Sequence, residues 1–525
     1  MKGVSVNQSI AIDLPGFQPH LKRIGLGFLL VLAFLMGIGG GFRFICLGKK
    51  VYWHDEAYSS LRIFGHTGEA YYREIFDNKI HSVSEIKKYQ RINPDLGLGT
   101  TIRALASRPE HPPLYFLLGR LWAGLFDDPV TALRMLSAVF GFLLLPSMFF
   151  LSRELFSDPL VPWISMALAA VSPLHLLYAQ EARQYSLWST LTLFSCALFL
   201  RCLRKPGFCS WMLYTIAMIT GLYTHIMFGL TAVVHGLYLI LMRDKSLYPA
   251  LKPFGISIAV AVLLFTPWLW AISTSIPDIH NKIAWMYVVV PMKQLIHNWL
   301  LSLNRLFVDF PGSEDLIPAT LSMVVISIIF MVRGTPKRSW LMPILLMIVV
   351  GSVVILPDVL TGGRRSQETR YLLPFLLAVQ ICVAAFLSAA VKPGAYWMPI
   401  GRFLAILVFI AGLLSQMVVL SSDSWWNKSV SARKNEIAAM INAQEKPILI
   451  TMLGEINPGE ILSMSYLLKD DVRLWLFSEP VPPVIPKDTG RVFVLNPPWA
   501  IQEMLEKKFK MTVIDEKDNL WEINQ

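Results

Sequence analysis

Long apolar runs recur along this chain of 525 residues and constrain its fold more than any other feature. We predict eleven membrane-spanning helices, because about 20 apolar residues in a helix cross the roughly 30 Å hydrocarbon core of a bilayer. The composition agrees, since 54% of the residues are apolar and only 16% are charged. The predicted spans cover residues 24–46, 131–152, 160–179, 184–202, 210–226, 227–242, 253–272, 315–332, 339–356, 371–391 and 403–421.

The net charge of +11 lies on one side of these spans. Segments on the side of the N-terminus hold 15 of the 47 basic and four of the 36 acidic residues, so the rest of the chain carries 32 of each. Such an excess of basic residues marks the cytoplasmic face, which places residues 1–23 in the cytoplasm. The charge therefore needs no nucleic-acid partner. We expect a multi-pass protein of the cytoplasmic (inner or cell) membrane in contact with membrane lipids.

A large loop at residues 48–130 is predicted on the opposite, outer face. It contains the apolar segment 112–126, whose 15 residues would make only about 22 Å of helix. The segment also contains Arg120, and counting it as a span would place every later basic loop outside. We therefore predict an interfacial or re-entrant helix there.

Residues 422–525 are more charged and less apolar than the chain before them. Short strand patterns alternate with helical ones, which predicts a small α/β domain. Eleven spans place this domain outside the cytoplasm, after a mainly α transmembrane helix bundle at residues 24–421. Strands are predicted at 447–452, 472–477, 491–495, 510–514 and 520–523, and helices at 428–444, 458–468 and 498–508.

Two adjacent carboxylates, Asp55 and Glu56, follow the first predicted span closely. An isolated carboxylate is costly near hydrocarbon, so its presence there favours a functional site. A structural alternative is open, because Asp is a preferred N-cap and acidic residues suit the first turn of a helix. The local sequence does not separate these two interpretations.

The predicted topology brings other polar side chains to the same membrane-level layer. Each has a structural alternative, since arginines extend to lipid headgroups and tyrosines populate the aromatic belt. As a set they suit a phosphate-containing substrate, because arginine binds phosphate and a carboxylate takes the proton of an attacking hydroxyl. The set comprises Glu110, His111, Tyr115, Glu181, Arg183, Tyr185, His225, Arg364, Arg365, Arg370 and Tyr371.

The order of these motifs resembles the GT-C glycosyltransferases that use polyprenyl-phosphate sugars. The resemblance is strongest to the bacterial branch grouped with dolichyl-phosphate-mannose–protein mannosyltransferases and lipid A aminoarabinose transferases. It covers residues 50–200, continues in part over 200–390 and does not extend to 422–525. Its motifs are Asp55-Glu56, EHPPLYFLLGRLWAGLF at 110–126, ALRMLSAVFGFLLLPSMFFLSRELF at 132–156, SPLHLLYAQEARQYSL at 172–187 and RYLLPF at 370–375.

The resemblance implies an inverting transfer of a sugar from a polyprenyl-phosphate donor to a lipid, polysaccharide or protein acceptor on the outer face. It implies that Asp55 is the catalytic base and that Glu56 helps to place donor or acceptor. Arg183 matches a donor-phosphate arginine, and residues 110–113 match a loop that borders the phosphate. The aminoarabinose transferases have lysine at the position of His111, which leaves that contact open. We predict donor-phosphate or lipid binding by Arg183, Arg364, Arg365, Arg370, His111 and Tyr185, and further substrate contacts by Glu110, Tyr115, Glu181, His225 and Tyr371.

Metal binding is undecided from the sequence. His54, Asp55 and His111 could together hold a divalent ion, although no spacing typical of a metal site supports this. No other cofactor is assigned.

A non-catalytic alternative is a transporter or flippase for lipid-linked sugars, or a scaffold that retains the fold. A transporter predicts charges near the bilayer midplane and repeated halves. In this chain the charges gather at one interface, and the sequence shows no internal repeat. The enzyme interpretation is therefore preferred, with the sugar, the acceptor and the oligomeric state unspecified.

Overall fold

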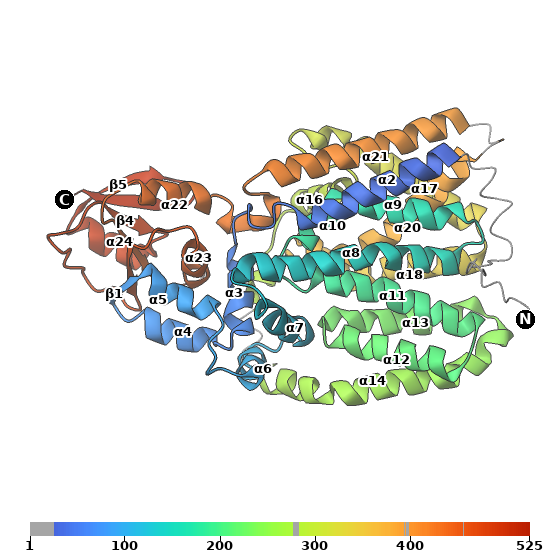
Figure 1. Ribbon diagram of the computed structural model, residues 1–525, viewed down its shortest axis with the longest axis horizontal. Coiled ribbons are helices and arrows are strands. Elements are labelled where there is room, and N and C mark those ends of the chain that lie inside the picture. The colour runs from blue at the N-terminus through green and yellow to red at the C-terminus, as the bar shows by residue number, and fades with distance from the viewer. Residues whose placement is uncertain (1–25, 277–282, 393, 395–397, 455, 525) are drawn as a thin grey trace, which may run out of the picture.

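The computed structural model describes residues 26–276, 283–392, 394, 398–454 and 456–524. Long helices run roughly parallel in a bundle, and a smaller head lies at one end of that bundle (Figure 1). We use "head" for helices α3–α7, the β-sheet and helices α22–α24. The predicted cytoplasmic segment at residues 1–23 lies outside the described residues.

Each predicted span corresponds to a helix or to a pair of helices in the bundle. Within the described ranges, eight helices are long and apolar enough to cross a membrane, and the pair α9–α10, bent by 63°, raises the number to nine. The bundle helices are α2 (Leu26–Gly41), α8 (Pro129–Leu155), α9 (Leu160–Val171), α10 (Pro173–Ala179), α11 (Tyr185–Arg204), α12 (Phe208–Leu222), α13 (Gly229–Met242), α14 (Tyr248–Thr274), α17 (Ile317–Gly334), α18 (Lys337–Val354), α20 (Leu373–Val391) and α21 (Met398–Ser421).

The predicted mainly helical, multi-pass membrane architecture is confirmed. Helices α12 and α13 have only 15 and 14 residues, so the count of eleven spans stays a prediction. Large apolar side chains on the outside of the bundle are exposed, including Ile240, Leu263 and Trp270 at 67–73%. An apolar exterior of this size is what a lipid environment requires.

The head contains a six-stranded sheet with the order β1-β3-β2-β4-β6-β5. Strands β3, β2 and β4 are parallel, whereas β1, β6 and β5 join their neighbours antiparallel. The small C-terminal α/β fold predicted from the sequence is confirmed. Its strands are β2 (Ile448–Met452), β3 (Arg473–Phe477), β4 (Val492–Leu495), β5 (Lys510–Asp515) and β6 (Leu520–Asn524), and its helices are α22 (Lys434–Asn442), α23 (Asn457–Met464) and α24 (Trp499–Glu506).

The sixth strand, β1 (Lys79–Ser82), comes from the loop at residues 48–130 and was not predicted. It pairs with β3, so that Ile80 lies opposite Trp475. The head is thus assembled from two segments far apart in the sequence, and a domain boundary at residue 422 remains a prediction. The loop also contributes α3 (His54–Ile63), α4 (Gly68–Ile75), α5 (Val83–Lys87) and α6 (Leu98–Ala106).

The segment predicted as an interfacial or re-entrant helix forms α7 (Leu114–Ala123). This helix has ten residues and lies at the junction of head and bundle (Figure 1). Its Arg120 is buried and donates a hydrogen bond of 3.0 Å to the carbonyl oxygen of Ile63 at the end of α3. The arginine therefore helps to fix α7 against the helix that carries Asp55.

Candidate functional site

Helix α3 carries both carboxylates and begins one residue before them. Trp53 occupies the N-cap position, and its backbone N–H donates a hydrogen bond of 3.4 Å to Oε2 of Glu56. Asp55 lies in the first turn, where its carboxylate contacts side chains from other parts of the chain. The structural alternative, a role in capping the helix, therefore fits Glu56 better than Asp55.

Asp55 meets two arginines that the bundle supplies. Nη1 of Arg370 lies 3.0 Å and Nη2 of Arg183 lies 3.6 Å from Oδ2 of Asp55. Nε2 of His54 lies 3.3 Å from the other carboxylate oxygen, Oδ1. Arg183 precedes α11 and Arg370 lies just before α20, so residues more than 300 positions apart converge on one carboxylate.

The electrostatics keep Asp55 ionised. Burial alone would raise the pKa of this carboxyl, but Arg183, His54 and Arg370 together hold it well below its ordinary value. The side chain of Asp55 is 23% exposed. It can therefore present a negative charge to a molecule that enters from outside.

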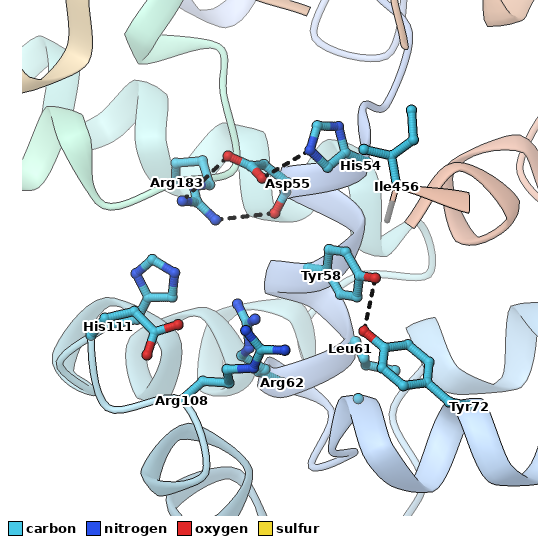
Figure 2. Close-up of a pocket in the computed structure, with 12 residues that line it drawn as sticks. His54, Asp55, Tyr58, Leu61, Arg62, Tyr72, Arg108, His111, Arg183 and Ile456 are labelled. Carbon is cyan, nitrogen blue, oxygen red and sulfur yellow. Dashed lines mark hydrogen bonds and ion pairs between the residues drawn. The ribbon is translucent and has the colours of Figure 1, made fainter. Parts of the chain in front are cut away.

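Asp55 opens into a cavity of about 260 Å³. Figure 2 shows Asp55 between Arg183 and His54, with Arg62, Arg108 and His111 on another side of the same space. The lining residues are His54, Asp55, Tyr58, Leu61, Arg62, Gly68, Tyr72, Arg108, Glu110, His111, Arg183 and Ile456. The site is thus strongly polar and rich in arginine.

Glu56 faces the interior of the protein and does not line this cavity. Its side chain is 0% exposed, and Arg134 donates two hydrogen bonds to it, of 2.9 and 2.8 Å. Nζ of Lys428 and the backbone N–H of Ala182 lie 2.9 and 2.8 Å from it, in addition to the N–H of Trp53. Burial would raise the pKa of Glu56, but Arg134 and Lys428 outweigh burial and lower it. This buried cluster joins α3, α8, the turn before α11 and the segment after α21.

Two more of the predicted donor contacts, besides Arg183 and Arg370, lie near Asp55. Oη of Tyr185 accepts a hydrogen bond of 3.3 Å from Nη2 of Arg183. His111 lines the cavity, and Nε2 of Gln184 lies 3.5 Å from its Nδ1. Burial, followed by the charges of Arg183 and Arg62, lowers the pKa of His111 well below its usual value. A neutral imidazole therefore stands where the resemblance gives a lysine.

Other predicted site residues have partners elsewhere. Arg365 binds Asp358 at 2.9 Å, and neither Arg364 nor Arg365 is in the lining of the cavity. Oη of Tyr115 lies 2.8 Å from Oγ of Ser137 in the interior.

The remaining predicted substrate contacts are also held by protein groups. Glu181 is buried and accepts a hydrogen bond of 2.9 Å from Asn427. The ring of His225 stacks on Trp188 at a centroid distance of 4.1 Å, and Tyr371 lies beneath the guanidinium of Arg370 at 5.6 Å. Of the predicted substrate contacts, Glu110 alone is among the described lining residues.

A metal site is not assembled in the part of the chain that the structure describes. No three or more His, Cys, Asp or Glu side chains there are arranged to hold an ion. His54 and Asp55 are in contact, whereas His111 reaches the cavity from a different segment.

The C-terminal domain packs directly on the helix that carries Asp55. A Cβ atom on Gly459 of α23 would lie 2.7 Å from Cε2 of Tyr58 and 3.0 Å from Cβ of His54. The backbone N–H of His54 donates to Oγ of Ser431 at 3.1 Å, and that hydroxyl donates to Glu460 at 2.5 Å. The C-terminal domain therefore helps to position Asp55.

Sequence reasoning also missed several lining residues. Arg62 had a usable signal, because it follows Asp55 by seven residues and so lies on the same face of a helix. Lys428, which pairs with Glu56 outside the cavity, had a weaker signal, as a lysine two residues after a pair of tryptophans. Nothing in the sequence indicated that Ile456 would reach the cavity.

Comparison with known proteins agrees with this architecture. The family model described as dolichyl-phosphate-mannose-protein mannosyltransferase matches residues 110–270. The crystal structure of ArnT from Cupriavidus metallidurans bound to undecaprenyl phosphate aligns with a TM-score of 0.55 and 13% identity, over 95% of this chain and 98% of that chain. The apo structure of the same protein gives 0.54 and 12%, over 95% and 97%. The chain has the GT-C fold of membrane glycosyltransferases.

The GT-C similarity extends over almost the whole of both chains, so it includes the head as well as the bundle. The matched family segment contains Glu110, His111 and Arg183, whereas Asp55 lies before it. A comparison with the sequences of curated proteins finds no match.

Proposed function

We propose that the protein transfers a sugar from a polyprenyl-phosphate donor to an acceptor hydroxyl, with Asp55 as the base. The head then faces the outer side of the cytoplasmic membrane, and the N-terminus lies in the cytoplasm. The observation that carries the proposal is an ionised, reachable Asp55 held between two arginines that border membrane helices. A base and phosphate-binding cations at the level of the lipid headgroups are what this transfer needs.

The reaction forms two bonds and breaks two. The acceptor hydroxyl gives its proton to Asp55 while its oxygen attacks the anomeric carbon of the donor sugar. The bond from that carbon to the phosphate oxygen breaks, and the polyprenyl phosphate departs with the electron pair. Attack opposite to the leaving phosphate inverts the configuration of the anomeric carbon.

Arg183 and Arg370 serve two partners in this scheme. Without donor they contact Asp55, which lowers its pKa and makes it a weak base. A donor phosphate that binds both guanidinium groups shares their positive charge, so the proton affinity of Asp55 rises when the donor is in place. The same two arginines then stabilise the negative charge of the departing phosphate.

Glu56 has a positioning role in this proposal. Both of its oxygens are occupied by Arg134, Lys428 and the N–H of Ala182, so it does not reach donor or acceptor. Its ion pairs instead hold α3 in place, with Asp55 on the cavity side. The cluster therefore positions the base and takes no part in the transfer.

The test compares Asp55→Asn with a matched control, Asp95→Asn, which removes an exposed carboxylate from the same loop. Cells that lack the gene receive the wild type or one variant, and mass spectrometry measures the envelope glycolipids, polysaccharides and glycoproteins. We expect a sugar modification that the wild type and Asp95→Asn restore and that Asp55→Asn does not, at equal amounts of membrane protein. Restoration by Asp55→Asn would rule out Asp55 as the base.

A further inference from the structure

The cavity contains two arginines that form no ion pair among the described residues, although the nearby carboxylate of Glu110 favours the charged form of Arg62. Arg62 lies at the end of α3, and Arg108 follows α6. Neither side chain makes an ion pair or a hydrogen bond among the described residues, although the ring of Tyr58 lies 5.7 Å from the guanidinium carbon of Arg62. Figure 2 shows both side chains in the cavity, close to one another and away from the contact between Asp55 and Arg183. This pair differs from Arg183 and Arg370, which both contact Asp55.

The charges that line the cavity do not balance. Its lining contains Asp55 and Glu110 against Arg62, Arg108 and Arg183. Positive charge in a partly enclosed space attracts anions, and arginine binds phosphate and carboxylate in a bidentate manner. The cavity is therefore suited to an anionic ligand beyond the groups that the protein itself supplies.

The two arginine pairs come from different parts of the structure around the cavity. Arg62 follows Asp55 by seven residues, which is about 10 Å along a helix at 1.5 Å per residue. Arg183 and Arg370 border the bundle helices α11 and α20. Arg62 and Arg108 belong to the head, beside Gly68 and Tyr72 of α4. The first pair therefore borders the bundle, and the second pair borders the head.

The groups around Arg62 and Arg108 also suit sugar hydroxyls. Oε2 of Glu110 is buried and has no hydrogen-bond partner among the described residues. The hydroxyls of Tyr58 and Tyr72 lie 2.9 Å apart at the cavity wall. Buried polar groups require partners. A ligand with both an anionic group and hydroxyl groups would supply them, because the anion would bind the arginines and a hydroxyl would donate to Glu110.

We propose that Arg62 and Arg108 form a second anion-binding subsite, which holds the acidic group of the acceptor. The acceptor is then an acidic glycan, a sugar that carries a phosphate or a carboxylate. This inference rests on the proposed function, since it needs Arg183 and Arg370 to hold the donor phosphate. It names the class of acceptor that the same cavity takes.

Binding to the purified, lipid-reconstituted protein tests the subsite. The protein is first saturated with undecaprenyl phosphate, and calorimetry then measures the binding of glucose 6-phosphate, glucuronate or the neutral methyl glucoside. The variants are Arg62→Gln and Arg108→Gln, and Arg103→Gln is the control because this exposed arginine lies on α6, outside the cavity lining. Loss of one charged hydrogen-bonding partner weakens binding roughly ten- to a hundredfold.

We expect the lipid-loaded wild type and Arg103→Gln to bind at least one acidic sugar at least tenfold more tightly than methyl glucoside. We expect Arg62→Gln and Arg108→Gln to lose that preference while their affinity for undecaprenyl phosphate stays within twofold. Equal binding of acidic and neutral sugars would overturn the subsite.

The second phosphate of a diphosphate donor is the other possible source of the anion. In that case undecaprenyl diphosphate would bind the wild type more tightly than the monophosphate, the advantage would vanish in Arg62→Gln, and the loaded protein would bind no acidic sugar. This result would overturn the assignment to the acceptor.

Different results would contradict the proposed subsite and the proposed function. If Asp55→Asn abolishes transfer while the arginine variants keep their preference for acidic sugars, the subsite is wrong and the function stands. If the arginine variants lose the preference while Asp55→Asn still transfers sugar, the base is wrong and the subsite stands.

Discussion

The two sides of α3 give opposite environments to two adjacent carboxylates. Asp55 is 23% exposed and opens into the cavity, whereas Glu56 is 0% exposed and faces Arg134 and Lys428. Successive residues of a helix are rotated by about 100°, so neighbours in the sequence can face different surroundings. Glu56 anchors the helix, and this anchoring holds Asp55 on the side of the cavity, where a substrate can reach it.

The anchoring side draws on three distant parts of the chain. Arg134 comes from α8, Lys428 from the segment after α21, and Ala182 from the turn before α11. A buried ion pair contributes little net stability compared with apolar packing, but removing one partner leaves an unpaired buried charge. Variants on the anchoring side should therefore affect folding first and chemistry second.

The largest expected effect on stability comes from Arg134→Met. This change leaves Glu56 with Lys428 and the backbone N–H groups of Ala182 and Trp53. Loss of one partner of a buried ion pair costs about 3–5 kcal/mol. Thermal unfolding in detergent, together with the yield of folded protein, measures the loss. Arg103→Met on exposed α6 should stay within about 0.5 kcal/mol of the wild type. A similar small change for Arg134→Met would contradict an anchoring role.

An effect of similar size is expected from Glu56→Gln, and it should depend on pH. The pKa of Glu56 is lowered in the folded protein, so its contribution to stability is complete above the ordinary value of 4.5 and is lost as the pH falls below it. At neutral pH the variant should be less stable than the wild type by about 3–5 kcal/mol, because the buried Arg134 and Lys428 both lose the carboxylate of their ion pairs. The difference should shrink as the solution is acidified below pH 4.5, which melting curves at several pH values would show.

The stability and transfer activity of Asp55→Asn at neutral pH are to be compared with those of Glu56→Gln. The carboxylate of Asp55 is partly exposed, so this variant should lose transfer with much less loss of stability than Glu56→Gln. If Asp55→Asn were the less stable of the two, the assignment of one reactive and one anchoring carboxylate would be reversed.

The smallest effect is expected from Gly459→Ala in α23. The added Cβ would lie 2.7 Å from the ring of Tyr58, so α23 or α3 must shift, at a cost of about 1–3 kcal/mol. We expect a lower transfer rate, because the shift displaces the helix that carries Asp55. Gly99→Ala is the control, since nothing lies within 4 Å of its added Cβ and alanine is the better helix residue. Identical rates for both variants would show that this contact does not position α3.

Much of the fold was predictable because it follows from local patterns. Apolar run length identified the bundle helices, and alternation identified all five C-terminal strands. Strand β1 was missed because four residues, Lys-Ile-His-Ser, carry no strand signal of their own and form a strand only beside β3. The pairing with β3 is a tertiary contact that no local window contains.

The site was predictable only in part, for a similar reason. Asp55, Arg183 and Arg370 were selected because charge is unusual near a membrane, and the structure brings them into contact. The same rule could not separate Asp55 from Glu56, because the partner of Glu56 at residue 428 lies beyond the last predicted span. Helical spacing from Asp55 would have identified Arg62.

The pairing of β1 with β3 sets an order for the assembly of the molecule. Ribosomes extend a chain by about 5–20 residues per second, so the nearly 400 residues between Ile80 and Trp475 take roughly 20–80 s to appear. During that interval β1, the helix with Asp55 and the site for Lys428 all lack their C-terminal partners. A nascent chain therefore carries Asp55 without the contacts that position it, and the geometry proposed for the reaction is restricted to molecules whose synthesis is almost complete.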